Sequence, residues 1–332
     1  MRDRLLLRPA IRVSVFMVMA SLALISTAVQ AQPGPITGFS FLRFEPSARA
    51  AALGGSFSSV YGDDVNGLFY NPALLNASMH NTLSVSYLNF LSDVNAGFLA
   101  YGRTYEALGS VGVGIRFLTW GDVQGGDEQG NKTGSFGAGD VALTVGLARS
   151  YGETFRYGGN VHFVHSQIES YRASALAADV GIVYHLAASR FTASASVNNV
   201  GFALQSLGAE RDELPMDLRL GVSKRLEHVP LLLSLTVYNL NHPNEVADGT
   251  GAISRALHFV LIGGEFQFSP AFNLRFGYNH RRHEALKAQS RLDTAGLGVG
   301  FGLKVAGANV DYAFNSWSSA GGLHQFTLRT KL

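Results

Sequence analysis

The chain has 332 residues, of which 47% are hydrophobic and only 15% are charged, with a net charge of +2 and no cysteine. A soluble domain usually carries about 25% charged residues, so part of this surface must be unusually apolar. The small net charge and the lack of a basic run exclude a typical nucleic-acid-binding protein. The absence of cysteine excludes a disulfide framework.

Residues 1–31 have the pattern of a secretory signal peptide. Four arginines, the last at Arg12, precede an apolar run over 13–28, and Val29 and Ala31 are suitable small residues for a cleavage site. We therefore expect an exported protein whose mature chain begins near Gln32. A retained anchor helix is the alternative.

From Thr82 onward, large apolar residues alternate with small or polar ones. The run Leu297–Leu303 has a large apolar residue at every second position, and Phe272–Asn279 alternates in the same way with polar partners. Strict alternation marks a strand with one apolar face. No run after the N-terminus reaches the ~18 apolar residues of a membrane helix, so a closed barrel is the main remaining way into a membrane.

We predict about fourteen strands over 82–332, many of them about 9–11 residues long, which is the length a tilted strand needs to cross a bilayer. Short predicted connections fall near 150–155, 187–190, 226–230, 269–270 and 305–306, and longer, more polar ones near 120–138, 168–175, 200–216, 240–256 and 282–291. This sorting predicts an all-β, antiparallel transmembrane barrel of the bacterial outer membrane, with its short turns in the periplasm. A soluble β-sandwich is the alternative, but it has no reason to sort its loops.

Residues 32–81 match neither the signal peptide nor the strands, and we interpret them as a plug. Within them, Ser47–Leu53 is a helix-forming run that Pro46 can open and that the following glycine pair can end. A short helix of small residues fits a barrel lumen, where Arg49 could meet carboxylates. The orientation of the strands places the plug on the periplasmic side, from which it would enter the lumen. A periplasmic extension that docks elsewhere is the alternative.

The polar face of the strands would line the lumen, and charged residues recur on it. These predicted lumen charges are Arg116, Asp179, Arg219, Glu265, Arg275, Asp311 and Arg329. Charged side chains are costly toward lipid but acceptable in a polar interior. We interpret them as a paired network that holds the plug, with a selective conduit as the alternative.

No catalytic or cofactor-binding pattern emerges. His162 and His165 are three positions apart, which on a strand directs them to opposite faces. The stretch 280–284 lacks the spacing of a zinc protease and is expected in an exposed loop, and the acidic loop 120–138 misses the spacing of a calcium site. We therefore expect no enzymatic activity, no cofactor and no metal.

One set of residues in the plug carries a family resemblance: Phe41, Leu42, Pro46, Ser47, Arg49, Gly54, Gly55, Asp63, Asp64, Asn71 and Pro72. Together with the glycine-rich loop 125–140, it resembles the PorV/PorQ family, which are FadL-like outer-membrane barrels of the type IX protein secretion system. The compact loops look more like PorQ members than PorV members. The chain departs from many outer-membrane barrels in ending on Leu332 rather than on an aromatic residue.

The resemblance implies a non-enzymatic scaffold in the complex that attaches secreted cargo to the cell surface. Its implied partners are PorZ, PorU and PorV-like proteins, together with outer-membrane lipid or lipopolysaccharide. A FadL-like channel for hydrophobic molecules is the first alternative, and a PorV-like cargo shuttle is the second. An apolar tunnel would favour transport, whereas a lumen filled by 32–81 would favour a sealed scaffold.

Overall fold

The structure is a computed structural model that describes residues 38–90, 94–126, 132–208, 211–243, 245–246, 251–286, 294–317 and 321–332. The predicted signal peptide lies outside the described residues, as do residues 32–37 of the predicted plug.

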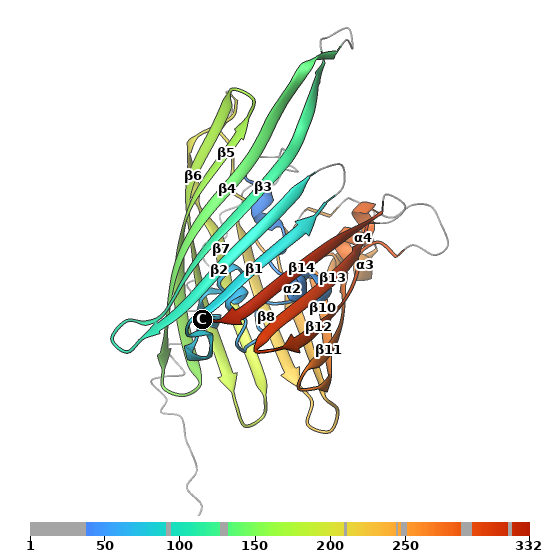
Figure 1. Ribbon diagram of the computed structural model, residues 1–332. Helices are drawn as coiled ribbons and strands as arrows, with labels where there is room; N and C mark the ends of the chain where they lie inside the picture. The colour runs from blue at the N-terminus through green and yellow to red at the C-terminus, as the bar shows by residue number, and fades with distance from the viewer. Residues whose placement is uncertain are drawn as a thin grey trace, which may run out of the picture. The chain divides into compact units, whose positions relative to one another are not determined.

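Fourteen antiparallel strands close into a barrel in the described part of the chain, each beside its neighbours in sequence, and β14 completes the ring beside β1 (Figure 1). The predicted fold class and strand number are confirmed. The strands are β1 (Thr82–Asn89), β2 (Asn95–Tyr105), β3 (Gly109–Gly126), β4 (Lys132–Tyr151), β5 (Phe155–Ile168), β6 (Tyr171–Leu186), β7 (Phe191–Gln205), β8 (Asp217–Arg225), β9 (Leu231–Val237), β10 (Val260–Ser269), β11 (Phe272–Asn279), β12 (Leu297–Val305), β13 (Ala308–Ser316) and β14 (Gly322–Lys331).

Helices are short and lie outside the strands. Ahead of β1 come η1 (Ser40–Arg43), α2 (Ala48–Ala52), η2 (Val65–Phe69), η3 (Pro72–Leu74) and η4 (Ala77–Met79), and α3 (Ala252–Leu257) and α4 (His280–Leu286) lie in connections between strands. None of the helices in the described residues is long and apolar enough to cross a membrane.

The two ends of the barrel differ in their connections. At one end, here the turn end, the connections are short: 106–108, 152–154, 187–190, 226–230, 270–271 and 306–307. At the other, here the loop end, the longest are 206–216, 238–259 and 280–296. The predicted sorting of connections therefore holds for these three long loops.

Other predicted loops are wrong because polar composition does not prevent strand pairing. The predicted loop 120–138 is mostly strand, since β3 and β4 remain paired past a bulge at Thr119 and Asp122, and both strands project at the loop end (Figure 1). The predicted loop 168–175 is a tight turn, because β5 ends at Ile168 and β6 begins at Tyr171. Backbone hydrogen bonds between neighbouring strands need no apolar side chains. The stretch 280–284, also expected as a loop, begins helix α4.

Alternation along the strands gives the wall two chemically different faces. The outward face carries large apolar residues such as Val145, Val161 and Val180, each more than half exposed. The inward face carries buried polar residues such as Thr144 and Asn160. This is the arrangement of a barrel that meets lipid outside and polar groups inside.

Candidate functional site

Residues 38–81, here the inner segment, lie inside the closed barrel. Thr327 of β14 accepts a hydrogen bond from the Ala48 amide (2.8 Å), and on the far side of the ring Ser223 of β8 donates one to the Ser59 carbonyl (2.7 Å). Helix α2 packs against β11–β14, and η3 packs against β4–β6. Strands all around the wall therefore contact the segment.

The inner segment runs the length of the barrel. Its first described residue, Gly38, lies at the loop end, where its amide is 3.5 Å from the carboxylate of Asp212. Its last turn lies at the turn end, where His80 accepts a hydrogen bond from the Thr104 amide. The segment therefore spans both ends of the barrel, and the expectation that it enters from the turn end stays a prediction, because residues 32–37 lie outside the described residues.

Helix α2 forms where the small-residue run predicts it. Ser47 is the N-cap, and its hydroxyl accepts a hydrogen bond from the Ala50 amide. Gly54 and Gly55 end the helix with φ of 67° and 87°, a conformation that favours glycine. A Cβ on Gly54 would also lie 2.8 Å from the Tyr278 amide nitrogen. The glycine pair therefore allows the end of the helix to lie directly against β11.

Other residues of the set that resembles the PorV/PorQ family cap short helices or pack in the lumen. Asn71 caps η3, which begins at Pro72, and Asp64 caps η2 in the same way. Phe41 and Leu42 are buried in the lumen, whereas the Asp63 side chain is 55% exposed.

An apolar cluster occupies the loop-end half of the lumen. The inner segment contributes Phe39, Phe41 and Leu42, and the wall contributes Leu88, Phe98 and Leu118, all at most 5% exposed. Leu207 and Leu214, from the connection 206–216, pack against this loop-end cluster. The inner segment and the wall therefore form one apolar cluster in this half of the lumen, beside the charged side chains of Arg116, Asp217 and Arg219.

Charged groups occupy the turn-end half, where they connect the inner segment to the wall. Arg49 donates two hydrogen bonds to Glu265 of β10 (2.8 and 2.9 Å), and Arg275 of β11 donates a third to the same carboxylate (2.7 Å). Arg275 also bonds to Asp311 of β13 (2.6 Å). The chain of charges Arg49–Glu265–Arg275–Asp311 is almost completely buried. Paired, bidentate geometry of this kind is the strongest form of charged hydrogen bond.

A second attachment joins the segment to β14. Asp64 lies 3.0 Å from Arg329 and 3.7 Å from Arg49, and Asp63 lies 3.6 Å from Arg329. We call Arg49, Asp64, Glu265, Arg275, Asp311 and Arg329 the ionic network. Four of the seven predicted lumen charges belong to it.

The other three predicted lumen charges lie elsewhere in the lumen. Arg116 donates to the Leu42 carbonyl (2.7 Å) and lies 4.6 Å above the Phe69 ring. Asp179 accepts a hydrogen bond from His162 (2.6 Å), and Arg219 pairs with Asp217 (2.6 Å). These groups hold the segment or brace the wall individually rather than as one conduit.

The shifted pKa of Asp64 makes the stability that the ionic network provides depend on pH. Burial would raise this pKa, but the adjacent Arg329 and Arg49 outweigh burial and lower it below the ordinary 3.8. A folded-state pKa below the unfolded value means that the stabilisation is fully present above the unfolded pKa and is lost as the pH falls below it.

We therefore expect the urea midpoint of unfolding to fall as the pH drops below about 4. The variant Asp64→Asn should be less stable at neutral pH and should show a smaller fall, because it lacks the titrating group. Asp63→Asn is the matched control, since that side chain is mostly exposed. Equal pH slopes for the native chain and Asp64→Asn would refute the assignment.

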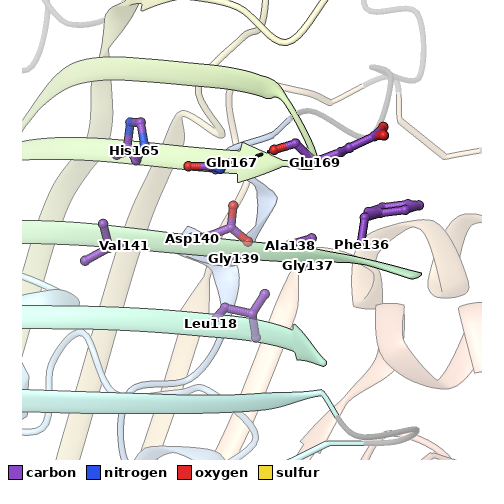
Figure 2. A pocket seen from close by; sticks show the side chains of 10 residues that line it. All are labelled: Leu118, Phe136, Gly137, Ala138, Gly139, Asp140, Val141, His165, Gln167 and Glu169. Carbon is purple, nitrogen blue, oxygen red and sulfur yellow. Dashed lines mark hydrogen bonds between the residues drawn. The ribbon is translucent and has the colours of Figure 1, made fainter. Parts of the chain in front are cut away.

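A hollow lies in the wall at the loop-end part of β3, β4 and β5 (Figure 2). Its volume is about 670 Å³. Leu118 and Asp140 are buried on the inward face, whereas the strand alternation directs Val141, His165 and Gln167 outward. Because Leu118 also belongs to the loop-end cluster, the hollow reaches from the outward face to a residue of that cluster.

The hollow exists because of local backbone features. In β3, two residues oppose one in β4 between Thr119 and Asp122, with Gly121 at φ 67°, the arrangement of a bulge with a left-handed glycine. On β4, Gly137 and Gly139 carry no side chain to fill the space, and a Cβ on Gly137 would have nothing within 4 Å.

Several contacts within the lumen are not predicted from the sequence. His162 bonds to Thr144 (2.8 Å) as well as to Asp179, and Tyr70 donates a hydrogen bond to Glu45. The polar residues on β5 and β6 carry the signal of a lumen face, but their pairing depends on strand register. No group of three or more possible metal ligands occurs among the described residues.

The fold has known counterparts, although no protein-family model and no curated protein matches the chain. A TodX monoaromatic hydrocarbon channel (the deltaS2S3 mutant) has a TM-score of 0.57 at 13% identity, covering 85% of this chain and 97% of that one. The Ralstonia pickettii toluene transporter TbuX has 0.54 at 13%, covering 89% and 100%. A Pseudomonas aeruginosa FadL homologue has 0.51 at 10%, covering 86% and 98%. At these identities the likeness establishes a FadL-like outer-membrane barrel fold, and the finer resemblance to PorV/PorQ stays a prediction.

Proposed function

We propose that this chain is an outer-membrane channel for small hydrophobic molecules. The loop-end cluster carries the proposal, because it makes one end of the lumen apolar and shares Leu118 with the lining of the wall hollow. The hollow is within the roughly 300–1,000 Å³ of small-molecule sites. Barrels of this fold include a monoaromatic hydrocarbon channel and a toluene transporter, which supports an apolar substrate class.

The ionic network decides which path such a molecule can take. A straight path through the lumen would pass the buried charges that join Arg49 to Glu265 and Asp64, and an apolar solute gains nothing from displacing them. Passage therefore requires either movement of the inner segment or a side route at the wall hollow. The first route needs the segment to be free to shift against the wall, and the second does not.

A reversible cross-link tests whether the segment moves. The Ser56 and Thr236 hydroxyls are 3.1 Å apart, so Ser56→Cys with Thr236→Cys should form a disulfide between the segment and β9 in this cysteine-free chain. We expect the oxidised variant to take up radiolabelled toluene no faster than cells without the protein, and a reductant to restore uptake. Intact bacteria expressing the chain are the test system.

The control cross-link joins two strands of the wall to each other and not to the segment. Thr104→Cys with Ser110→Cys replaces hydroxyls 3.0 Å apart on β2 and β3 and should leave uptake unchanged. Full uptake in the oxidised Ser56/Thr236 pair would exclude movement of the segment and leave the wall hollow as the route. Toluene uptake no faster than in cells without the native protein would contradict the channel itself.

A second candidate function is a sealed scaffold of the type IX secretion system. The density of the lumen favours it, because Leu53, Phe57, Leu68 and Leu74 of the inner segment are fully buried, and this segment bears the PorV/PorQ pattern. Its partners would be the PorZ, PorU and PorV-like proteins, bound at the long loops. A pull-down from native outer membranes discriminates between the two. Recovery of secretion-system proteins, lost when 206–216 or 240–256 is deleted, would support the scaffold, and recovery alone with toluene uptake would support the channel.

A further inference from the structure

A polar cavity lies at the turn end of the barrel, on the far side of the ionic network from the loop-end cluster. Its volume is about 200 Å³, and its lining comes from β8, β10, β11, β12, β13 and β14 together with Arg49 and Asp63 of the inner segment. The lining includes Arg275 and Arg329, whose side chains are more than nine-tenths buried. The cavity is therefore built into the barrel rather than lying on its surface.

Positive charge exceeds negative charge in the lining. Five cationic side chains and three carboxylates, those of Asp63, Glu265 and Asp311, line the cavity. Asp64, which pairs with Arg329 and Arg49, is a fourth carboxylate beside them. The ionic network pairs most of these charges, but two cationic side chains of the lining, Arg225 and Lys304, lie outside it. A cavity with surplus positive charge and restricted access to water attracts a small anion.

Three donors in the lining are incompletely satisfied. Lys304 lies exposed at the rim of the cavity and makes no ion pair with any residue that the structure describes. Gly302, two positions earlier on β12, faces Arg275 and Asp311, so the strand alternation directs Lys304 to the same side. Arg225 donates one hydrogen bond to Gln267 (3.2 Å), and its other terminal nitrogen is 3.5 Å from Glu265, which two other arginines already share. Arg329 Nη1 is buried and makes no well-formed hydrogen bond, although Asp64 is 3.0 Å away.

We propose that this cavity is a binding site for one small oxyanion, a phosphate or carboxylate group, held by Lys304, Arg225 and Arg329. Guanidinium and ammonium groups bind such oxygens through charged hydrogen bonds, and arginine does so with two parallel donors. The bound anion would lie beside Asp64 and share Arg329 with it. In the orientation of outer-membrane barrels, the site opens to the periplasm.

Equilibrium dialysis of the purified full-length barrel in detergent, with radiolabelled inorganic phosphate at constant ionic strength, tests this site. We expect saturable binding of one phosphate per chain and at least about a tenfold loss of affinity in Lys304→Gln, the loss typical of one charged hydrogen bond. Lys304 takes no part in the ionic network, so the variant should fold. Lys224→Gln is the matched control, because this lysine lies near the same end of the barrel on the outward face.

The same assay with acetate as competitor separates the two anion types. Displacement of phosphate by acetate shows that the site accepts carboxylates, and its absence restricts the site to phosphate; both outcomes support an oxyanion site. Absence of saturable binding of either anion at millimolar concentration would overturn the proposal. Equal affinities of Lys304→Gln, Lys224→Gln and the native chain would also overturn it, since the bound ion would then lie elsewhere.

Discussion

Deleting residues 38–75 is expected to convert a non-conducting barrel into an open ion channel. A fourteen-stranded wall is wider than the roughly eight-stranded barrels whose interiors side chains alone can fill. In this protein the inner segment fills that space, with Leu53, Phe57, Leu74 and Leu75 completely buried. Without it, the polar inward face would line a water-filled pore. Single-channel recording in planar bilayers should show long-lived openings for the deletion variant and none for the native chain.

A single substitution tests the same prediction in case the deletion variant misfolds. Arg49→Glu retains the whole chain but places a carboxylate against Glu265 and Asp64, where like charges repel. It should show intermittent openings. The matched control is Arg190→Glu, which alters an arginine in a turn-end connection outside the lumen contacts. A silent bilayer for both the folded deletion variant and Arg49→Glu would mean that the segment does not block ion flow.

Replacing Glu265 with glutamine is expected to destabilise the barrel by about 3–5 kcal/mol, the range found when one partner of a buried ion pair is removed. This carboxylate accepts hydrogen bonds from both Arg49 and Arg275 (2.7–2.9 Å), so its loss leaves two buried cations short of a partner. Asp64 and Asp311 would compensate only in part, since Asp64 already serves Arg329, and Asp311 binds Nη1 of Arg275 whereas Glu265 binds its Nε. Urea unfolding in lipid vesicles, followed by tryptophan fluorescence, measures the change.

Two further variants identify the cause of that loss. Glu153→Gln changes an exposed glutamate in a short turn and should shift the midpoint little. The double variant Arg49→Met with Glu265→Gln removes one of the stranded cations, so its destabilisation should be smaller than the sum of the two single changes. Strict additivity would show that Arg49 and Glu265 do not act as a pair.

The two candidate functions make different use of the same lumen. A scaffold needs the ionic network only as a permanent attachment of the inner segment. A channel needs the loop-end cluster to be reached by substrate, through the wall hollow or past a displaced segment. Toluene uptake by the native chain therefore separates them, because a scaffold has no uptake to lose. The cross-link between Ser56 and Thr236 then decides which of the two routes a channel uses.

The sequence by itself determined the architecture, because the physics involved is local. Alternation such as that over Leu297–Leu303 requires a strand with one apolar face wherever the strand lies, and enough such strands without membrane helices leave a closed barrel. Ser47 as a cap and Gly54-Gly55 as a helix end are also local, since each acts on the adjacent backbone.

Only the tertiary structure decided how the site is assembled, because that depends on register and on the path of the segment. Glu265 follows Arg49 by 216 positions, and nothing local distinguishes it from Asp179, which pairs with His162 instead. The extension of β3 and β4 through a predicted loop, and the hollow beside it, depend on one bulge near Gly121. The direction of the inner segment through the lumen likewise depends on contacts of Gly38 with the distant connection 206–216. Sequence patterns report which face a residue takes, whereas long-range pairing decides which residue it meets there.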